Sequence, residues 1–592
     1  MTQRYLFLFC LLTSGLFAQH PTTFLPRHQA VTEPNGYLSA PPDGPFSSAI
    51  VTPPVLPVRA MAEWEELQAL LITWNGQSTI LSEIVRAARL ECKVIICCAS
   101  ESIITSAKNT LTSKGVDFSS NVTFLVVPND SIWIRDYGPN CVYANDVDSL
   151  YLIDWIYNRP RPKDDLVPEK IANYLGVPLY STTEAPYTLV NTGGNFMSDG
   201  MGTAFSSELI YADNGPDPLY QLGQGVQTEA EVKAILHDFM GIDRYINMEP
   251  LPYDGIHHID MHMKLLDEET LLIGQYPPNT ADGPQIEANL QYVLSNYPTP
   301  FGTPYKVIRI PMPADGNGDY PDDGGQYRTY ANAVFVNKTV ILPFYEQKFD
   351  TTAQRIWEES LPGYHIVGIN CNSIIGSKGA IHCITKEIGV ADPLRIVPEP
   401  ILGLACGGQQ VKATISHRSG IASARFHYTI DQGSSWEEIE MTPSLDPNTP
   451  DLWTTWLSYQ PTVNSLPVYY YFDATAQNGK QAVRPLPAPE GYWKVMLAPC
   501  VATEEAPTAT LLDIYPNPAH AITCIPVSTT DKTLASIRVF NTLGQQITTL
   551  FAGELPAGTS NYFLDASQYV PGTYFVQLQT SLQTVLKKLA IR

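Results

Sequence analysis

The feature that most constrains the fold of this chain is a change in its hydrophobic periodicity near residue 395. Before it, short apolar runs typical of buried strands, such as "ALLITW" (69–74) and "KVIICCA" (93–99), alternate with segments of helical spacing, such as "ILSEIVRAARL" (80–90). This alternation predicts an α/β architecture. At 592 residues the chain is also too long for a single core, so we expect several domains.

Beyond this point helical spacing is lost, and short alternating strands such as "RFHYTID" (425–431) and "VYYYFDAT" (468–475) are separated by turn signals such as "QNGK" (477–480). The pattern is typical of an immunoglobulin-like β-sandwich, which we place at 396–499. A linker rich in Thr, Glu and Pro follows at 500–510, and a second, smaller all-β domain at 511–592. The α/β domain then occupies 59–395.

The first residues predict a secretory signal peptide at 1–19. Arg4 precedes an apolar run that is too short to cross a bilayer, and the run ends in small or polar residues. Residues 20–58 are rich in Pro, Thr and Ser without periodicity, which indicates an extended lead-in or a removable pro-segment. We expect the mature protein to be soluble, because no other run of about 18 apolar residues occurs.

The net charge and the number and spacing of the cysteines bear on which molecules and metals the chain can bind. The formal net charge of -23 would repel nucleic acid and attract cationic substrates, although solubility alone could explain it. Ten cysteines are few for an exported chain of this length, and none shows zinc-ligand spacing. Cys406 and Cys500 bracket the predicted sandwich, and whether they form a disulfide stays open.

One cysteine stands in an unusual setting, the stretch "GAIHCIT" (379–385). Cys383 is either a small buried hydrophobe or a nucleophile. If the run is extended, His382 and Cys383 point to opposite faces, so a base for the thiol must come from elsewhere in the chain.

Four other stretches offer the remaining parts of a site, although each alone is more often structural. They supply carboxylates, an imidazole, a turn that permits close backbone approach, and an amide in an apolar strand. These are Asp136 beside Trp133 in "NDSIWIRDYGPN", His258 and Asp260 in "GIHHIDMHMK", Gly193, Gly194 and Asn195 in "NTGGNFMSDGMGTA", and Asn332 in "YRTYANAVFVN". Two carboxylates, one imidazole and one thiol suit a planar cation such as a guanidinium, whose central carbon is open to sulfur.

The motifs "WIRDYGP", "TGGNFMSDG", "HHID" and "GAIHCIT" occur in the order found in the guanidine-modifying enzymes of the agmatine deiminase and bacterial peptidylarginine deiminase group. The chain resembles this family over about residues 55 to 395. The resemblance implies a pentein α/β propeller of five pseudo-repeats, although no repeat is visible in the sequence. It also implies that no metal or other cofactor is required.

The same resemblance implies a role for each matched residue. Cys383 would be the nucleophile and His258 the general acid and base. The other matched residues would grip the guanidinium (Asp136, Asp260), line its slot (Trp133) and support the cysteine (Asn332). Gly194 and Asn195 are expected to bind the substrate through close backbone approach, which glycine permits. Thr192 departs from the family, because agmatine deiminases generally have Glu before the Gly-Gly pair.

The stretch "YNRPRPKDD" (157–165) bears on the substrate. Arg159 and Arg161 are two residues apart and stiffened by prolines, so both could face one anion, or they could form a solvated loop. By resemblance to bacterial peptidylarginine deiminases, they would bind the α-carboxylate of a C-terminal arginine. We therefore expect conversion of peptidyl arginine to citrulline and ammonia through a covalent thiouronium. An agmatine or free-arginine deiminase and a catalytically silent surface binding protein stay open as alternatives.

The last domain carries "YPNPA" (515–519), "VFNTLGQ" (539–545) and "LKKLAI" (586–591) in order. It resembles the C-terminal sorting domain of the type IX secretion system. The resemblance implies export by that machinery to the outside of the cell, with release or anchoring at the outer-membrane surface.

One acidic stretch, "DGNGDYPDDGG" (315–325), is similar to a calcium loop. Gln326 stands where an EF-hand needs its bidentate glutamate. We expect an acidic surface loop and consider a structural cation there as a further option.

Overall fold

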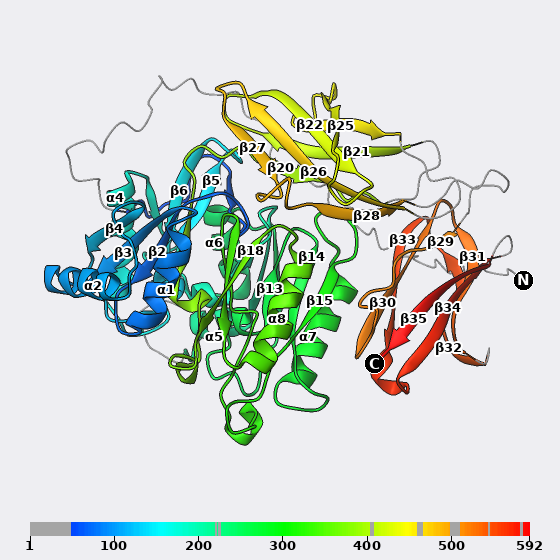
Figure 1. The fold of residues 1–592 in the computed structure, drawn as a ribbon, viewed down its shortest axis with the longest axis horizontal. Helices are drawn as coiled ribbons and strands as arrows, with labels where there is room; N and C mark the ends of the chain where they lie inside the picture. The colour runs from blue at the N-terminus through cyan, green and yellow to red at the C-terminus, as the bar shows by residue number, and fades with distance from the viewer. Residues whose placement is uncertain are drawn as a thin grey trace, which may run out of the picture.

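The computed structural model describes residues 49–218, 222, 226–402, 408–458, 466–497, 509–542, 545–580 and 584–592. Figure 1 shows an α/β region, an all-β region drawn in yellow above it, and a second all-β region in orange and red beside it. The predicted signal peptide, most of the lead-in, and both Cys406 and Cys500 lie outside the described residues. Among the described helices, none has the length and apolar character needed to span a membrane.

The α/β region contains five small sheets that share one pairing pattern, in which an antiparallel pair is extended by a parallel strand. In pairing order, the sheets are β1 (Val58–Ala60), β5 (Asn140–Ala144), β6 (Ser149–Asp154) and β8 (Leu179–Ser181); β10 (Met197–Ser198), β11 (Thr203–Ser207) and β12 (Arg244–Met248); β13 (Met263–Leu265), β14 (Thr270–Gln275) and β15 (Lys306–Pro311); β16 (Val334–Val336), β17 (Thr339–Phe344) and β18 (His365–Asn370); and β19 (Lys386–Gly389), β2 (Leu67–Thr73), β3 (Lys93–Cys98) and β4 (Val122–Val126). A further short pair joins β7 (Ile156–Tyr157) to β9 (Val190–Asn191).

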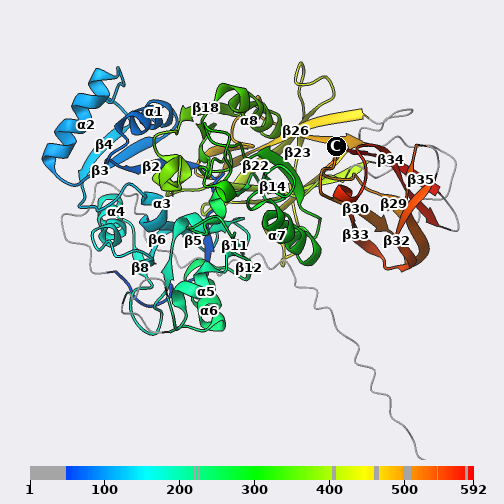
Figure 2. The same ribbon diagram turned by 90° about the horizontal axis from the view of Figure 1, so that it is seen from below.

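Each parallel strand is reached through a helical crossover, as parallel pairing requires. The helices are α1 (Ser78–Ala88), α2 (Glu101–Ser113), α4 (Val167–Leu175), α5 (Leu209–Asn214), α6 (Glu229–Met240), α7 (Gly283–Asn296) and α8 (Gln347–Ser360). Figure 2 shows α1, α8, α7, α6 and α4 placed in turn around the outside of the region. The apolar face of α1 is buried at Ile80, Ile84, Val85 and Ala88, the spacing that predicted this helix.

The two ends of the α/β region meet in one sheet. Strand β19, the last of the region, pairs antiparallel with β2, near its beginning. The described end of the lead-in is also tied down, because Ile50 forms a bridge with Tyr180 of β8. The chain therefore closes on itself, and residues on either side of β2 and β19 become neighbours.

The yellow region consists of two sheets around one apolar core that includes Val411, Phe426 and Phe472. The sheets are β20 (Arg395–Pro398), β21 (Gln409–Ser416), β25 (Leu452–Leu457) and β24 (Thr442–Pro443); and β23 (Glu437–Glu440), β22 (Ile421–Thr429), β26 (Leu466–Ala476) and β27 (Gln481–Arg484), with β28 (Trp493–Leu497) also paired to β26. This order is consistent with the predicted immunoglobulin-like sandwich, which we keep as a proposal.

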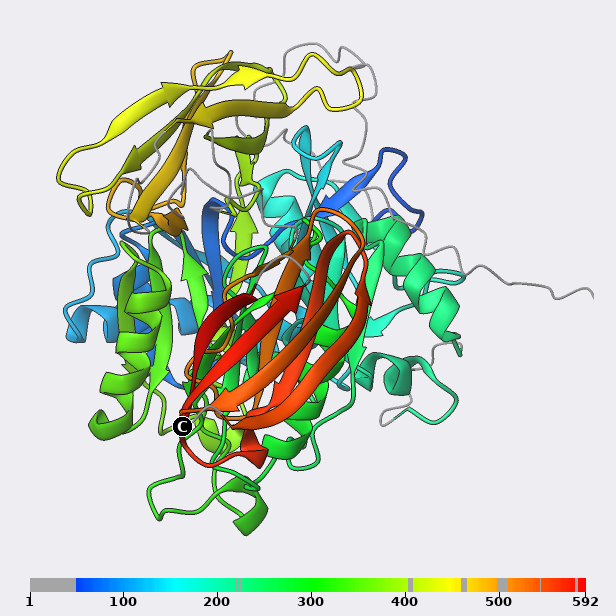
Figure 3. The ribbon, with the colours of Figure 1, turned by 90° about the vertical axis from the view of Figure 1, so that its right-hand side faces the viewer.

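The C-terminal region also has two sheets, seen in front of the α/β region in Figure 3. They are β29 (Ala509–Leu511), β30 (Ile522–Thr529) and β33 (Gly558–Asp565); and β32 (Gln546–Leu555), β31 (Thr533–Asn541), β34 (Gly572–Thr580) and β35 (Thr584–Ile591). In β34 buried and more exposed side chains alternate, as expected of a strand with one face on a core. The prediction of an α/β region followed by all-β structure is thus confirmed.

Candidate active site

Five short turns carry the candidate residues, and each turn lies just before the strand that opens the antiparallel pair of one of the five sheets. They are α3 (Ile134–Tyr137) with Asp136 before β5, the 3-10 turn Gly193–Asn195 before β10, His258 with the 3-10 turn Ile259–Met261 before β13, Asn332 before β16, and the 3-10 turn His382–Ile384 with Cys383 before β19. The turns of α3, Gly193–Asn195, Ile259–Met261 and His382–Ile384 contact one another. Because the five turns occupy the same position in their five sheets, residues that are far apart in sequence lie close together.

Cys383 lies at the centre of this cluster and is only 3% exposed. Asn332 Nδ2 donates to its Sγ at 3.2 Å, and Sγ lies 3.5 Å from Asp260 Oδ2. Burial and the charges of Asp260 and Asp136 raise the pKa of the Cys383 thiol well above its ordinary value. Without a cation in the site, the thiol is therefore protonated near neutral pH.

His382, the neighbour of Cys383, does not lie in an extended run. The local backbone is a 3-10 turn, so the expectation of two residues on opposite faces of a strand was wrong. The inference that His382 does not serve Cys383 directly still agrees with its contacts: its Nδ1 lies 2.7 Å from Asp260 Oδ2, and its Nε2 lies 3.0 Å from Glu63 Oε1.

Asp260 is fully buried. Burial by itself would raise its pKa, but the hydrogen bond and the charge of His382, together with the charges of His258 and Arg135, outweigh burial and hold the pKa of Asp260 below its ordinary value. Its Oδ2 faces His382, whereas its Oδ1 is buried and makes no hydrogen bond. A buried carboxylate oxygen without a partner is rare and marks a place where a donor can bind.

His258 is 3% exposed and lies between two polar groups. Its Nε2 is 3.5 Å from Thr192 Oγ1, and its Nδ1 is 3.7 Å from Asp136 Oδ1 but makes no hydrogen bond. Thr192, the position at which this chain departs from the family pattern, thus contacts the imidazole with a hydroxyl where a carboxylate would be expected.

Gly194 packs directly against this pair. A Cβ at Gly194 would lie 2.5 Å from His258 Nδ1 and 3.2 Å from Asp136 Oδ1, closer than atoms can approach without displacement. The Gly194 amide donates to Asp136 Oδ1 at 3.3 Å. Asn195, in contrast, exchanges hydrogen bonds with the backbone of Ser207, so its side chain orders the turn and points to β11.

The other oxygen of Asp136 connects to the basic stretch. Tyr157 Oη donates to Asp136 Oδ2 at 3.4 Å and accepts from Arg161 Nη1 at 2.9 Å. Arg159 Nη1 donates to the carbonyl of Asn158 at 3.0 Å. Arg161 is therefore linked to a candidate guanidinium ligand through one side chain, whereas Arg159 donates to the neighbouring backbone.

Trp133 lies at the edge of the candidate site, beside Cys383. A Cβ at Gly379 would lie 2.5 Å from Trp133 Cζ3 and 3.2 Å from Cys383 Cβ, so the indole packs on the backbone next to the thiol. Trp133 is partly exposed, whereas Cys383 and Asp260 are buried.

Sequence reasoning missed Glu63, His382 and Tyr157 as members of this cluster. Glu63 stands in "AEWEEL" with Glu65 and Glu66, and nothing in the sequence separates it from them. Tyr157 lies beside the arginine pair, and its phenol was a signal that could have been used.

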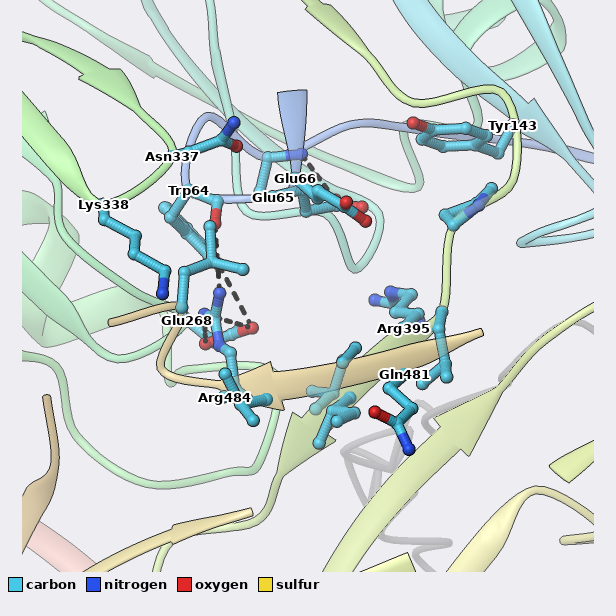
Figure 4. A pocket seen from close by; sticks show the side chains of 18 of the residues that line it. Trp64, Glu65, Glu66, Tyr143, Glu268, Asn337, Lys338, Arg395, Gln481 and Arg484 are labelled. Carbon is cyan, nitrogen blue, oxygen red and sulfur yellow. Dashed lines mark hydrogen bonds and ion pairs between the residues drawn. The ribbon is translucent and has the colours of Figure 1, made fainter. Parts of the chain in front are cut away.

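Figure 4 shows a cavity of about 360 Å³ away from Cys383, between the α/β region and the yellow region. It is lined by Trp64, Glu65 and Arg395, among others, and on one side Arg484 of β27 contacts Glu268 at 3.3 Å. None of the predicted site residues lines it, so we do not connect it with the chemistry.

The acidic loop at 315–325 does not gather a cation site. Asp315 Oδ1 accepts the backbone N–H groups of Asn317 and Asp319, as a turn-forming aspartate does. Within the described ranges, no group of three or more His, Cys, Asp or Glu side chains is arranged to hold a metal ion. The option of a structural cation therefore finds no support.

A buried thiol, an imidazole and two carboxylates, with Asp260 Oδ1 and His258 Nδ1 left without hydrogen bonds, suit a cysteine-dependent hydrolase that acts on a planar cation. The sequence model of the Porphyromonas-type peptidyl-arginine deiminase family matches residues 59–388, and the chain belongs to this family. The model of the secretion system C-terminal sorting domain matches residues 513–592. The protein is thus a deiminase of guanidino groups, a hydrolase acting on C–N bonds, and its last domain indicates secretion and attachment to the cell surface.

Two relatives carry the name agmatine deiminase. The protein of Vibrio parahaemolyticus is 25% identical over 45% of this chain and 78% of its own length, and that of Photobacterium profundum is 26% identical over the same shares. Among solved structures, the agmatine deiminases of C. jejuni and Enterococcus faecalis are each 20% identical, cover 56% of this chain and 95% of their own, and have TM-scores of 0.45 and 0.48.

Proposed function

We propose that this protein is a secreted deiminase that converts the C-terminal arginine of peptides to citrulline with release of ammonia. The observation that carries the proposal is the convergence of Cys383, His258, Asp136 and Asp260, with Asp260 Oδ1 and His258 Nδ1 left without hydrogen bonds. We also propose that the five sheets form the pentein propeller, because all five repeat one strand-pairing pattern and the last strand of the region, β19, pairs with β2 near its beginning.

In the proposed reaction, the guanidinium lies between Asp136 and Asp260. Its positive charge offsets the two carboxylates that raise the pKa of Cys383, so substrate binding favours the thiolate, and the thiol proton is released to solvent. Sulfur adds to the guanidinium carbon, His258 gives a proton to the departing nitrogen, and ammonia leaves. A thiouronium then links Cys383 to the substrate.

Water completes the cycle. His258, now neutral, takes a proton from water, the hydroxyl adds to the thiouronium carbon, and the C–S bond breaks. The product is a ureido group, and the thiol is restored. Each turnover removes one positive charge from the peptide.

Arg159 and Arg161 support a substrate with an anion near its guanidinium. The α-carboxylate of a C-terminal arginine provides one, and two guanidinium groups can pair with it. Agmatine carries no such anion, so the pair would gain nothing from it. The names of the relatives favour agmatine as the second candidate.

The test is ammonia release from three substrates: a peptide ending in arginine, free arginine and agmatine. We expect the peptide to have the highest kcat/KM, the same peptide with a C-terminal amide to be much poorer, and Cys383→Ala to lose at least about 10³-fold. Arg159→Ala with Arg161→Ala should raise KM for the peptide about 10- to 100-fold, with kcat little changed.

Preference for agmatine would assign the second candidate function. No turnover of any of the three, with the wild-type chain folded, would favour the catalytically silent binding protein.

A further inference from the structure

His382, which precedes Cys383 in the chain, is completely enclosed. It is 0% exposed, and both ring nitrogens face carboxylates: Nδ1 lies 2.7 Å from Asp260 Oδ2, and Nε2 lies 3.0 and 3.1 Å from the two oxygens of Glu63. The proposed chemistry uses neither Glu63 nor His382.

This geometry bears on the protonation of the ring. A neutral imidazole has one N–H, so its other nitrogen would direct a lone pair at a carboxylate. With a carboxylate at hydrogen-bond distance on each side, donation from both nitrogens is the arrangement in which no lone pair of the ring faces a carboxylate.

We propose that His382 is a positioning residue, an imidazolium clamped by Glu63, that keeps Asp260 ionised and turned so that Oδ1 faces the substrate guanidinium. The proposal rests on the proposed function for the identity of the substrate. It accounts for the two oxygens of Asp260, of which one is bonded to His382 and the other has no partner.

Other charged groups also face this clamp. Lys264 of β13 forms an ion pair with Glu63, and Arg135 of α3 donates from Nε to the carbonyl of His382 at 3.2 Å. Arg135 is itself paired with Glu387 of β19 at 2.8 and 2.6 Å. Lys264 thus shares Glu63 with His382, whereas Arg135 has Glu387. The charges of His258 and Arg135 also act on Asp260, and buried His262 lies near it, but of these groups His382 is the one that hydrogen-bonds to the Asp260 carboxylate.

The first test is His382→Asn, which retains an N–H near the position of Nδ1 but removes the charge. Asp260 then loses the cation that opposes its burial, so its pKa rises. We expect the acid limb of kcat/KM for the arginine-ended peptide to move up by at least about one pH unit, with activity restored at higher pH. A loss of equal size at every pH would overturn the proposal.

The second test is Glu63→Gln, which removes the carboxylate that favours the Nε2 proton. The His382 ring then loses its second proton more easily, so the basic limb of the pH profile of kcat/KM should move to lower pH. This shift is opposite in direction to that of the acid limb in His382→Asn. An unchanged basic limb would contradict the clamp. His417→Asn, at a buried histidine of the sandwich, should leave both limbs unchanged.

A readout without turnover separates this proposal from the proposed function. The rate of Cys383 alkylation by iodoacetamide against pH reports the thiol pKa, whatever the substrate is. In His382→Asn, ionised Asp260 no longer has a cation beside it, so the midpoint should rise. An unchanged midpoint would count against His382 even if the peptide is the substrate, and a raised midpoint would support it even if no peptide is turned over.

Discussion

At the scale of residues, the resting site holds two negative charges against a neutral thiol. Asp136 and Asp260 come from different turns, and their charges raise the pKa of Cys383 in addition to burial. The same two charges attract a guanidinium. The carboxylates that favour substrate binding therefore disfavour the reactive thiolate of Cys383 until the guanidinium is bound.

Asp136→Asn tests this opposition. Removing one carboxylate should lower the pKa of Cys383, so alkylation at pH 7 should become roughly 10-fold faster if the midpoint of alkylation falls by about one pH unit. Deamination should become at least about 10²-fold slower, because the guanidinium loses one partner. The measurements are mass spectrometry of the Cys383 peptide and ammonia release. Slower alkylation with slower turnover would contradict the assignment.

Sequence alone could propose Cys383, His258, Asp136, Asp260 and Asn332 as candidates. Each setting alone is more often structural, and the roles came from the order of the motifs in the family resemblance. Sequence could not identify Glu63, since three glutamates stand together and only the fold turns one of them to His382. It also could not place His382 beside Asp260, because the backbone around His382 forms a 3-10 turn and the apolar run gave no sign of one.

At the scale of elements, the unit is a turn followed by an antiparallel pair and a crossover helix. Hydrophobic spacing predicted the strands and helices near the N-terminus, such as α1 and β3, well. The sequence did not show that this unit repeats, because the five units share their strand pairing and turn position but not their residues. Asp136, Gly194, His258, Asn332 and Cys383 are chemically different, yet they occupy the same place in their units.

A buried ion pair between Arg135 and Glu387 links the turn of α3 to β19. Burial would raise the pKa of Glu387, but Arg135 outweighs it and lowers this pKa to about 2. A carboxylate with a depressed pKa stabilises the fold above its ordinary pKa near 4.5, and this contribution is lost as the pH falls toward 2.

Glu387→Gln should therefore destabilise the protein at pH 7 by about 3–5 kcal/mol, because Arg135 stays buried without its partner. The difference in Tm between wild type and variant, measured by calorimetry, should shrink between pH 5 and pH 3. Glu359→Gln, at an exposed pair with Arg355, should change little at either pH. A gap of constant size across this range would contradict the assigned pKa.

At the scale of the whole molecule, side chains of the first all-β region (β20 to β28) contact the segment that carries Glu63. Arg484 Nη1 donates to the carbonyl of Trp64 at 3.2 Å, and its Nη2 contacts Glu268 at 3.3 Å. Lys480 Nζ lies 2.7 Å from Glu66. The change of periodicity near residue 395 predicted two regions, but this contact joins residues over 400 positions apart, and no local pattern predicts it.

Arg484→Ala should lower the stability of the α/β region as well as that of the β region. Glu268 would stay buried without its cation, at a cost of about 3 kcal/mol. Calorimetry should show a lower first transition, and Arg425→Ala on the exposed face of β22 should cost less than about 1 kcal/mol. If both variants melt like wild type, the contact does not stabilise the protein.

The closure of β19 onto β2 also sets when the enzyme can first act. Glu63 precedes β2, and Cys383 precedes β19, so the reactive thiol gains its neighbours only after the ribosome has made nearly four hundred residues and the two ends have joined. A polypeptide that ends before β19 has neither Cys383 nor the strand that closes the region, so it cannot act as a deiminase. The candidate site is thus assembled only after the whole α/β region has been synthesised.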